Sequence, residues 1–483
     1  MKLIHRSPSY THLFVLFSTT LAVRALFFYS FMLQTTGDHI HYRQADSNDY
    51  HLGALCIALG NGMSTPGNNQ PMFWRTLGYP AYLSWFYTFH GIRSGDFNDN
   101  HAAQQMALWI QLLLCSLIPL IILYLAHLLT RSWPVAWLSS IIAVFHIGFV
   151  LASTYLLTEG IGMIFFYLFL IFLFKLLLDP SPRWVTTCLM TTLMLSIFTW
   201  IRPMGEFVGV LTMLLIACAA PGTFKTRMYK SLTFAIPFLT SLLPWYIRNY
   251  RLTGEWFYCP LSGIYLNVFC APKILRRTMG ISLIDGWKYT QQQAQVVIQK
   301  ASISLQGTAL HVSPLLSKKI AVPIIAAYPF YFCIDWIKEA CKTAFDLYSS
   351  QLTAYAKCTF WYDPLEEFVT EKIAECLWTQ PMPLLMRTTC WGEALFSISV
   401  WIGLLGGLWH FVLTPLFNRQ ALSQDDRRMQ RVWILSALIT IAIIGMTGGF
   451  GYARLRLPVE PLMIILSVMF WYTTYQARKT SHA

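Results

Sequence analysis

The chain has 483 residues, of which 55% are apolar and only 12% carry a charge, and its mean hydropathy is +0.49. Soluble domains carry roughly a quarter charged residues, whereas apolar runs such as 110–129 and 163–178 approach the roughly 20 residues that cross a bilayer. The composition excludes a soluble enzyme and predicts an all-α polytopic membrane protein. The formal charge of +13 fits basic residues that flank spans and meet anionic head groups, rather than nucleic acid.

The first apolar run extends from Leu13 to about Leu33 and follows a basic N-terminus with Lys2 and Arg6. No small-residue cleavage site is clear, so we interpret the run as a retained first span rather than a signal peptide. Arg24 lies inside this run, where a charge is costly. Its side chain either faces the protein interior or extends towards a head-group layer, and the sequence leaves both open.

The apolar runs predict a bundle of about ten transmembrane helices. They cover about residues 11–33, 103–129, 135–152, 156–178, 185–200, 203–219, 232–247, 394–416, 432–446 and 462–475. We expect an N-terminal transmembrane module (1–249), an extracytoplasmic or interfacial region (250–388) and C-terminal transmembrane helices (389–483). The first loop (35–100) is polar, with two predicted interfacial helices. In the middle region, residues 320–333 are apolar but contain two prolines and are shorter than a span, so we interpret them as interfacial or as part of an extracytoplasmic fold.

Basic residues gather in the short loops on one side of this predicted bundle. They are Arg131, Arg183, Lys225, Arg227, Lys230, Arg427, Arg428, Arg431, Arg478 and Lys479. The positive-inside rule makes that side cytoplasmic. The first loop, Glu159, Arg202, Arg248 and the segment 454–456 then share the opposite face, so we expect the site there.

Asp46, Asp49 and Tyr50 in the first loop are spaced i, i+3 and i+4. On a helix they share one face, with side-chain carbons about 5–6 Å apart. Two close carboxylates push their pKa values apart, which leaves one of them suited to act as a base. The alternative is an Asp N-cap followed by a solvated first turn, and the spacing does not decide between the two.

Several arginines accompany these acids. Arg75 follows Trp74 and precedes Gly78-Tyr79-Pro80, and its guanidinium suits bidentate contact with a phosphate, although a lipid head group is an equal alternative. Arg202, Arg248, Arg454 and Arg456 each lie at a predicted span end, where a single arginine would be an interface anchor. Because few acids are available to pair with them, their convergence predicts an anionic ligand. Glu159 would either orient one of these cations or stabilise a helix N-terminus.

An acid-bearing loop that faces cations suits the transfer of a group from a lipid phosphate. The arginines would stabilise the leaving phosphate, and an aspartate would deprotonate an acceptor hydroxyl or amine. The sequence has no Walker-type loop, HExxH, GxSxG or GxGxxG element. Its eleven cysteines include no C-x-x-C pair, so we predict no metal site formed by cysteines, while disulfides between loop cysteines stay open.

An ordered set of motifs runs from about residue 40 to 465. It comprises Asp46-Ser47-x-x-Tyr50 with Ala54, Leu59 and Gly60, Arg75-x-x-Gly78-Tyr79-Pro80, Thr158-Glu159, Arg202-Pro203, Pro244-Trp245-x-x-Arg248-Asn249 with Gly254, and Arg454-x-Arg456-x-Pro458-x-Glu460-Pro461. With these motifs the chain resembles the membrane-integral GT-C glycosyltransferases, in particular bacterial relatives of the dolichyl-phosphate-mannose-protein mannosyltransferases and of the lipid A aminoarabinose transferase. Each motif is weak alone, and the ordered set is fairly specific.

The resemblance implies a GT-C bundle in the bacterial inner membrane that transfers a sugar, with inversion, from a polyprenyl-phosphate donor to a protein, lipid or glycan acceptor on the periplasmic face. It predicts Asp46 as the general base with Asp49 as its neighbour. The remaining predicted site residues are Arg75, Arg202, Arg248, Arg454 and Arg456 for the donor phosphate, and Tyr50, Tyr79, Glu159, Asn249 and Glu460 in support. Ser47 stands where mannosyltransferases often carry Glu, so an acid-pair or metal role is in doubt; no cofactor is firmly implied and a divalent cation stays open.

A transporter or flippase of lipid-linked or anionic solutes is the alternative function. A transporter would show internal repeats and broken spans with polar residues at the midplane. The sequence has no such repeat and its polar groups gather at one face, which favours the transferase. A non-catalytic assembly protein would have no need of Asp46.

Overall fold

The computed structural model describes residues 7–33, 35–36, 39–40, 42, 46–67, 70–91, 100–180, 182–301, 314–349, 384–418, 422–447 and 453–481. Parts of the predicted middle region, 302–313 and 350–383, and with them Cys358 and Cys376, lie outside these ranges. The nine cysteines within the described ranges are free thiols: Cys56, Cys115, Cys188, Cys218, Cys259, Cys270, Cys333, Cys341 and Cys390.

The prediction of an all-α membrane protein is confirmed, apart from a two-stranded antiparallel pair, β1 (Thr35–Thr36) and β2 (His39–Ile40). The first half holds α1 (Tyr10–Phe27), the π-helix η2 (Phe28–Met32), α2 (Ser47–Ala58), α3 (Gly78–His90), α4 (His101–Cys115), α5 (Ile118–Thr130), α6 (Trp133–Phe145), α7 (Ile147–Thr154), α8 (Thr158–Leu178), α9 (Trp184–Ile201), α10 (Gly205–Ala219) and α11 (Phe224–Thr253). The second half holds α12 (Leu261–Tyr265), η3 (Leu266–Cys270), α13 (Ala271–Met279), α14 (Leu283–Ala301), α15 (Pro314–Ala327), α16 (Pro329–Phe345), α19 (Leu384–Leu408), η5 (Trp409–Leu413), α20 (Thr414–Asn418), α21 (Gln424–Thr447), the 3₁₀ turn η6 (Ala453–Leu455) and α22 (Glu460–Ser481).

Six helices in the described residues are long and apolar enough to cross a membrane, or up to eight if two bent pairs each count as one span. The six are Tyr10–Ser30, His101–Thr130, Thr158–Leu178, Trp184–Ile201, Arg387–Phe417 and Gln424–Met446, and the bent pairs are α6 with α7 and Lys319–Ala327 with α16. Judged by helix length and apolarity, the described residues therefore do not reach the predicted count of ten spans. The helix α10 is short, and charged or polar residues in α11 and α22 exclude these two helices from the six.

Helix α8 lies at the centre of the bundle, and 78% of its most apolar stretch is buried. Its sequence is apolar on every side, which is typical of a helix surrounded by protein rather than of one with a single buried face. It packs against α9, α5, α4 and α7. Arg24 of α1 is also fully buried and donates a hydrogen bond from Nη1 to the carbonyl of Cys115 at the end of α4, so it faces the protein interior.

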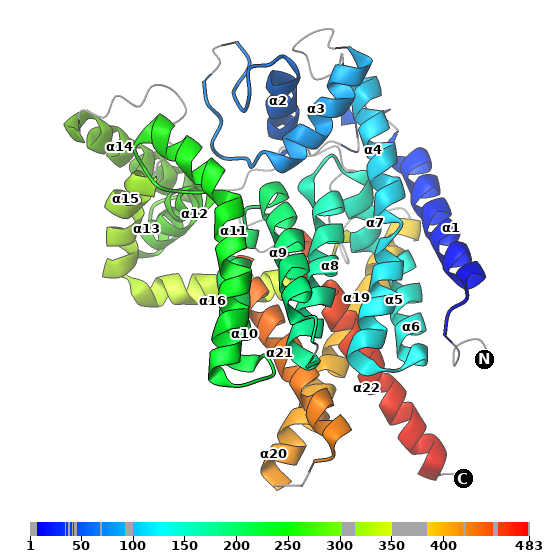
Figure 1. Ribbon diagram of the computed structural model, residues 1–483. Coiled ribbons are helices and arrows are strands. Elements are labelled where there is room, and N and C mark those ends of the chain that lie inside the picture. Colours follow the sequence, from blue (N-terminus) through cyan, green and yellow to red (C-terminus); the bar gives the residue numbers. More distant parts are fainter. Residues whose placement is uncertain are drawn as a thin grey trace.

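The first-loop helices α2 and α3 cover one end of the bundle (Figure 1). Side chains attach them there: Ser47 Oγ donates to the carbonyl of Leu156 at 3.0 Å, and Thr76 Oγ1 donates to that of Ile201 at 3.0 Å. At Gly78 the loop approaches α9 so closely that an added Cβ would lie 2.6 Å from the carbonyl oxygen of Trp200. Only glycine fits at this crossing.

Basic residues of α21 bind helix ends at the opposite end of the bundle. Arg428 donates to the carbonyls of Leu128 and Leu129 in α5 at 2.7 and 2.9 Å. Arg431 donates to the carbonyls of Leu177 in α8 at 3.2 Å and Ala219 in α10 at 2.7 Å. These guanidiniums satisfy the last carbonyls of three helices and complement their dipoles.

Candidate active site

The first-loop acids bind one arginine. Arg75 Nη2 lies 2.7 Å from Asp46 Oδ1, and its Nε and Nη2 donate to Asp49 Oδ2 at 3.0 and 2.8 Å. The spacing on the helix makes this possible, because Asp46 immediately precedes α2 and Asp49 lies in its first turn. The Asp46 side chain makes no N-cap hydrogen bond, so the N-cap alternative does not apply.

A second arginine reaches Asp46 from the other end of the chain. Arg454 of η6 lies with Nη2 3.0 Å from Asp46 Oδ2. Asp46 thus bridges Arg75 and Arg454, one with each carboxylate oxygen. The Arg75 side chain is 14% exposed, and those of Asp46 and Arg454 are about a third exposed, so the bridge lies at the edge of the buried interior.

Glu159 and Arg202 form the adjoining pair, with Glu159 Oε1 2.9 Å from Arg202 Nη1. Thr158 Oγ1 accepts from Arg202 at 3.3 Å and donates to Glu159 Oε2 at 3.3 Å. Glu159 lies within electrostatic range of both Asp46 and Arg454. We call Asp46, Asp49, Arg75, Glu159, Arg202 and Arg454 the charge cluster.

Two tyrosines, Tyr50 and Tyr79, pack beside the charge cluster. The guanidinium carbon of Arg75 lies 4.9 Å from the centre of the Tyr50 ring, a cation–π contact. The Tyr50 ring packs edge-on against Tyr79 with 5.2 Å between centroids, and Tyr79 Oη donates to Gln111 Oε1 at 2.9 Å. Tyr50 therefore contacts Arg75 directly, and Tyr79 supports the Tyr50 ring.

Charges of opposite sign balance in the charge cluster. Three carboxylates face three guanidiniums, each in an ion pair of 2.7 to 3.0 Å. The expectation that few acids are available to pair with the converging arginines is therefore wrong for Arg75, Arg202 and Arg454, and Arg456 has an acidic partner as well. An anionic ligand has to compete with carboxylates for these cations.

The pKa of Asp46 reflects this pairing. Burial raises the pKa of its carboxyl, but the guanidiniums of Arg454 and Arg75 lower it by more, so that it lies well below its usual range. For the same reason the Arg454 guanidinium, which burial alone would disfavour, has a pKa raised by Asp46 and Glu159. As long as both ion pairs hold, Asp46 is a carboxylate with little tendency to accept a proton.

Arg248 and Asn249 organise loops instead of contacting Asp46. Arg248 Nη2 donates to the carbonyls of Met63 and Met72 at 2.9 and 3.2 Å, and its Nη1 donates to Asn249 Oδ1 at 2.9 Å. Asn249 Nδ2 donates to the carbonyls of Phe257 and Tyr258, at 3.0 Å each. Together they tie the first loop to the end of α11.

Arg456 and Glu460, also predicted for the donor site, form a separate buried pair, in which Arg456 Nε lies 2.7 Å from Glu460 Oε2. Both side chains are only 3% exposed. Arg456 Nη1 also donates to the carbonyls of Thr343, Ala344 and Asp346 at the end of α16. We call these contacts the Arg456 clasp; they join Arg456 to Glu460 and the end of α16 rather than to the charge cluster.

Residues that the sequence did not single out complete the Arg456 clasp. His146 Nε2 and Tyr348 Oη each lie 3.2 Å from a Glu460 carboxylate oxygen. Asp346 Oδ2 accepts from the backbone N–H of Ala453, which holds the turn that carries Arg454. The one sequence feature that could have indicated the Arg456 clasp is His146, which stands between two apolar runs. In the structure it lies at the 51° bend between α6 and α7.

No group of three or more His, Cys, Asp or Glu suited to hold a metal ion occurs among the described residues. Acids of the charge cluster face guanidiniums, which occupy the positions a cation would need.

No family model matches the chain, and no curated protein matches it. Two crystal structures of ArnT from Cupriavidus metallidurans are similar to it, each at 13% identity over 93% of this chain. The structure bound to undecaprenyl phosphate has a TM-score of 0.37 over 78% of its own chain, and the apo structure has a TM-score of 0.33 over 77%. Scores this low mark only a loose correspondence of helices. ArnT is a GT-C glycosyltransferase, of the superfamily that the sequence motifs resemble.

Proposed function

We propose that the chain is a membrane glycosyltransferase that moves a sugar from a polyprenyl-phosphate donor to an acceptor, with inversion at the sugar carbon. The observation that carries this proposal is the position of Asp46 between Arg75 and Arg454. A carboxylate flanked by two guanidiniums at the edge of a membrane bundle supplies both a base and an oxyanion-binding pair.

In the proposed reaction the donor phosphate binds by competing with Asp46 for Arg75 and Arg454. Bidentate guanidinium contacts suit phosphate oxygens. Once released from its two cations, Asp46 regains a higher pKa and accepts the proton of the acceptor hydroxyl or amine. The acceptor atom then bonds to the sugar carbon from the face opposite the phosphate. The bond to the phosphate oxygen breaks, and its electron pair remains on the phosphate, held by the arginines.

We infer that the charge cluster lies on the extracytoplasmic side. Glu159 lies in the first turn of α8, and Arg431 binds the carbonyl of Leu177 near the other end of the same helix. The 21 residues of α8 span about 30 Å, which is the thickness of a hydrocarbon core. The basic residues of α21 and the charge cluster therefore lie about one bilayer apart, and the positive-inside rule makes the basic end cytoplasmic.

Two variants test the base and the phosphate site separately. Asp46→Asn leaves the charge cluster with one surplus positive charge, so polyprenyl phosphate should bind at least as tightly as to the wild type while transfer is lost. Arg454→Gln should weaken the binding of the same lipid by roughly 2 kcal/mol, about thirtyfold. Binding is measured with polyprenyl phosphate in lipid nanodiscs. Transfer is measured by mass analysis of envelope glycans from a deletion strain complemented with each variant.

Asp425→Asn is the matched control, because the Asp425 side chain is 88% exposed at the opposite end of the bundle. It should restore the glycans that the deletion removes. Full restoration by Asp46→Asn would exclude Asp46 as the base. Unchanged lipid binding by Arg454→Gln would exclude the phosphate role of that arginine. A deletion strain with unaltered glycans and impaired lipid translocation would instead favour a flippase.

A further inference from the structure

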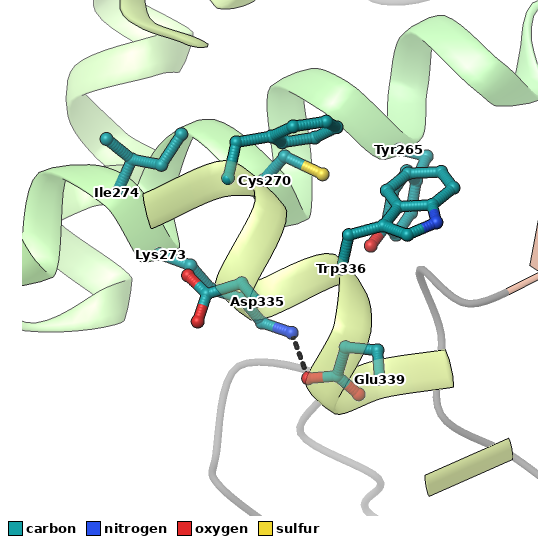
Figure 2. A pocket seen from close by; sticks show the side chains of 8 residues that line it. Tyr265, Cys270, Lys273, Ile274, Asp335, Trp336 and Glu339 are labelled. Carbon is teal, nitrogen blue, oxygen red and sulfur yellow. Dashed lines mark hydrogen bonds and ion pairs between the residues drawn. The ribbon is translucent and has the colours of Figure 1, made fainter. Parts of the chain in front are cut away.

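Helix α16 has three distinct faces, of which one is polar. The acids on this face are neutralised by α13: Glu339 Oε1 lies 2.6 Å from Lys273 Nζ, and Asp335 Oδ1 lies 2.6 Å from Arg277 Nη2. Figure 2 shows Asp335, Glu339 and Lys273 around a small cavity between the two helices. Its volume of about 10 Å³ holds no more than one water molecule. The polar face of α16 is therefore closed against α13.

The second face points into the bundle. Trp336 Nε1 donates to the carbonyl of Gly445 in α21 at 2.9 Å. Near the other end of α16, the carbonyl of Ala344 accepts from Trp401 Nε1 of α19 at 3.2 Å. Both contacts hold α16 against helices that qualify as membrane spans.

The third face is apolar and exposed. It carries Phe330, Cys333, Ile337 and Cys341, at i, i+3, i+7 and i+11, which form one stripe on a helix. Phe330 is 72% exposed and Ile337 is 61% exposed, and both cysteines are exposed. We call these four residues the outer stripe. A contiguous exposed stripe of this kind marks a surface that contacts a partner.

The position of α16 indicates which partner this is. The helix lies across the direction of the upright helices, level with the middle of α11 (Figure 1). A bend of 100° separates Lys319–Ala327 from α16, which begins at Pro329. At its C-terminal end Phe345 contacts Trp401 of α19, with 4.9 Å between ring centroids. The outer face of α19 is apolar and exposed along its length, at Leu395, Ile398, Ile402 and Leu405.

We propose that α16 lies in the plane of the membrane, inside the hydrocarbon layer, with the outer stripe against lipid acyl chains. The C-terminal end of α16 contacts α19 through Phe345 and Trp401, and α19 is long and apolar enough to span the bilayer and has an exposed apolar face. A helix satisfies its own backbone, so α16 can lie in hydrocarbon, and its acids are turned towards α13. Lys338, the charge nearest the outer stripe, has a flexible stem that lets its ammonium extend towards the polar layer. The sequence instead predicts an interfacial or extracytoplasmic position for residues 320–333, which include the start of α16.

The cysteines of the outer stripe provide the test. Variants that keep only Cys333 or only Cys341 are labelled with a bimane fluorophore and reconstituted into vesicles. A nitroxide attached to the lipid acyl chains should quench most of the fluorescence, and iodide in the water should quench little. Ile398→Cys in the same cysteine-free background is the lipid-facing control, and Asp425→Cys is the water-facing control with the opposite pattern.

Quenching by iodide as strong as at the Asp425→Cys control would overturn the proposal. So would quenching by neither agent, which would show that a protein covers the outer stripe. The wild-type chain gives a second readout that needs no substitution. In intact vesicles, Cys333 and Cys341 should resist a membrane-impermeant maleimide and should react after the bilayer is dissolved and the chain denatured. Rapid reaction in intact vesicles would contradict a lipid environment.

Discussion

Arg454 and Arg456 are separated by one residue and have opposite environments. Arg454 is 30% exposed and contacts Asp46, whereas Arg456 is 3% exposed and contacts Glu460 and the end of α16. Residues two apart on a helical turn do not share a face, so a motif with two arginines directs one to each side. The sequence predicts the same phosphate-binding role for both arginines, but only Arg454 belongs to the charge cluster.

Arg456→Gln should destabilise the protein more than Arg454→Gln. Removal of Arg456 leaves the Glu460 carboxylate buried beside His146 and Tyr348, and breaking one partner of a buried pair costs about 3–5 kcal/mol. Arg454 is partly exposed, and its removal should cost less stability. Thermal unfolding of both variants in the same detergent checks the order. Equal melting temperatures would contradict a structural role for the Arg456 clasp.

The depressed pKa of Asp46 makes a prediction for stability against pH. Because its folded pKa lies below the unfolded value of about 3.9, the stability from its ion pairs is present above that value and is lost as pH falls through the folded pKa. The difference in melting temperature between wild type and Asp46→Asn should therefore stay constant from about pH 7 to pH 5. It should narrow only in stronger acid. A difference that closes near pH 6 would mean that Asp46 is not held by Arg75 and Arg454.

At the scale of elements, the first loop depends on its close contact with α9. Thr76 and Gly78 attach the segment that carries Arg75 to the last turn of α9, and Ser47 attaches the start of α2 to the turn before α8. Both acids and the arginine that binds them thus reside on an element docked by a few polar contacts. The geometry of the charge cluster follows from this docking.

Gly78→Ala should displace that element. The new Cβ would lie 2.6 Å from the Trp200 carbonyl oxygen, where neither backbone gives way easily, and overpacking of this kind costs about 1–3 kcal/mol. Polyprenyl phosphate binding should weaken together with the melting temperature. Gly392→Ala in α19 is the control, because a Cβ there meets nothing within 4 Å, and it should leave binding unchanged. Wild-type binding by Gly78→Ala would show that the docking does not position Arg75.

At the scale of the whole molecule, two groups of charged residues lie at opposite ends of the bundle. Arg428 and Arg431 bind helix ends at one end, and the charge cluster lies at the other. Helices such as α8, α9 and α11 run between these ends, with the first-loop helices above and the C-terminus below (Figure 1). The predicted orientation of the chain in the membrane depends on this difference between the basic end and the end with the charge cluster.

Cysteine labelling from one side checks the orientation. Asn48, exposed on α2, and Asp425, exposed at the start of α21, lie at opposite ends. In right-side-out vesicles of a chain without other cysteines, an impermeant maleimide should label Asn48→Cys and spare Asp425→Cys. Inverted vesicles should give the reverse. The opposite result would place the charge cluster in the cytoplasm and exclude the proposed extracytoplasmic reaction.

The sequence predicted most spans of the fold but not how many helices qualify as spans. Long uniform runs such as α8 are recognisable because burial in lipid or protein demands apolar residues throughout. Helices α11 and α22 were assigned from their apolar centres, while their charged ends lower their mean hydropathy. The ion pairs of α16 could not be read from the sequence, because their partners on α13 lie 58 and 66 residues away along the chain.

The sequence by itself determined that the chain is a helical membrane protein and that acids and arginines gather at one end, because hydrophobic length and charge placement are local properties. It also identified Asp46, Asp49 and Arg75 as candidate site residues, because their spacing and their position in one loop are local features of the sequence. Only the tertiary structure decided that Arg454, 408 residues from Asp46 along the chain, completes the bridge while Arg456 is buried elsewhere. Ion pairing depends on which side chains come within about 4 Å, and packing between distant helices sets those distances.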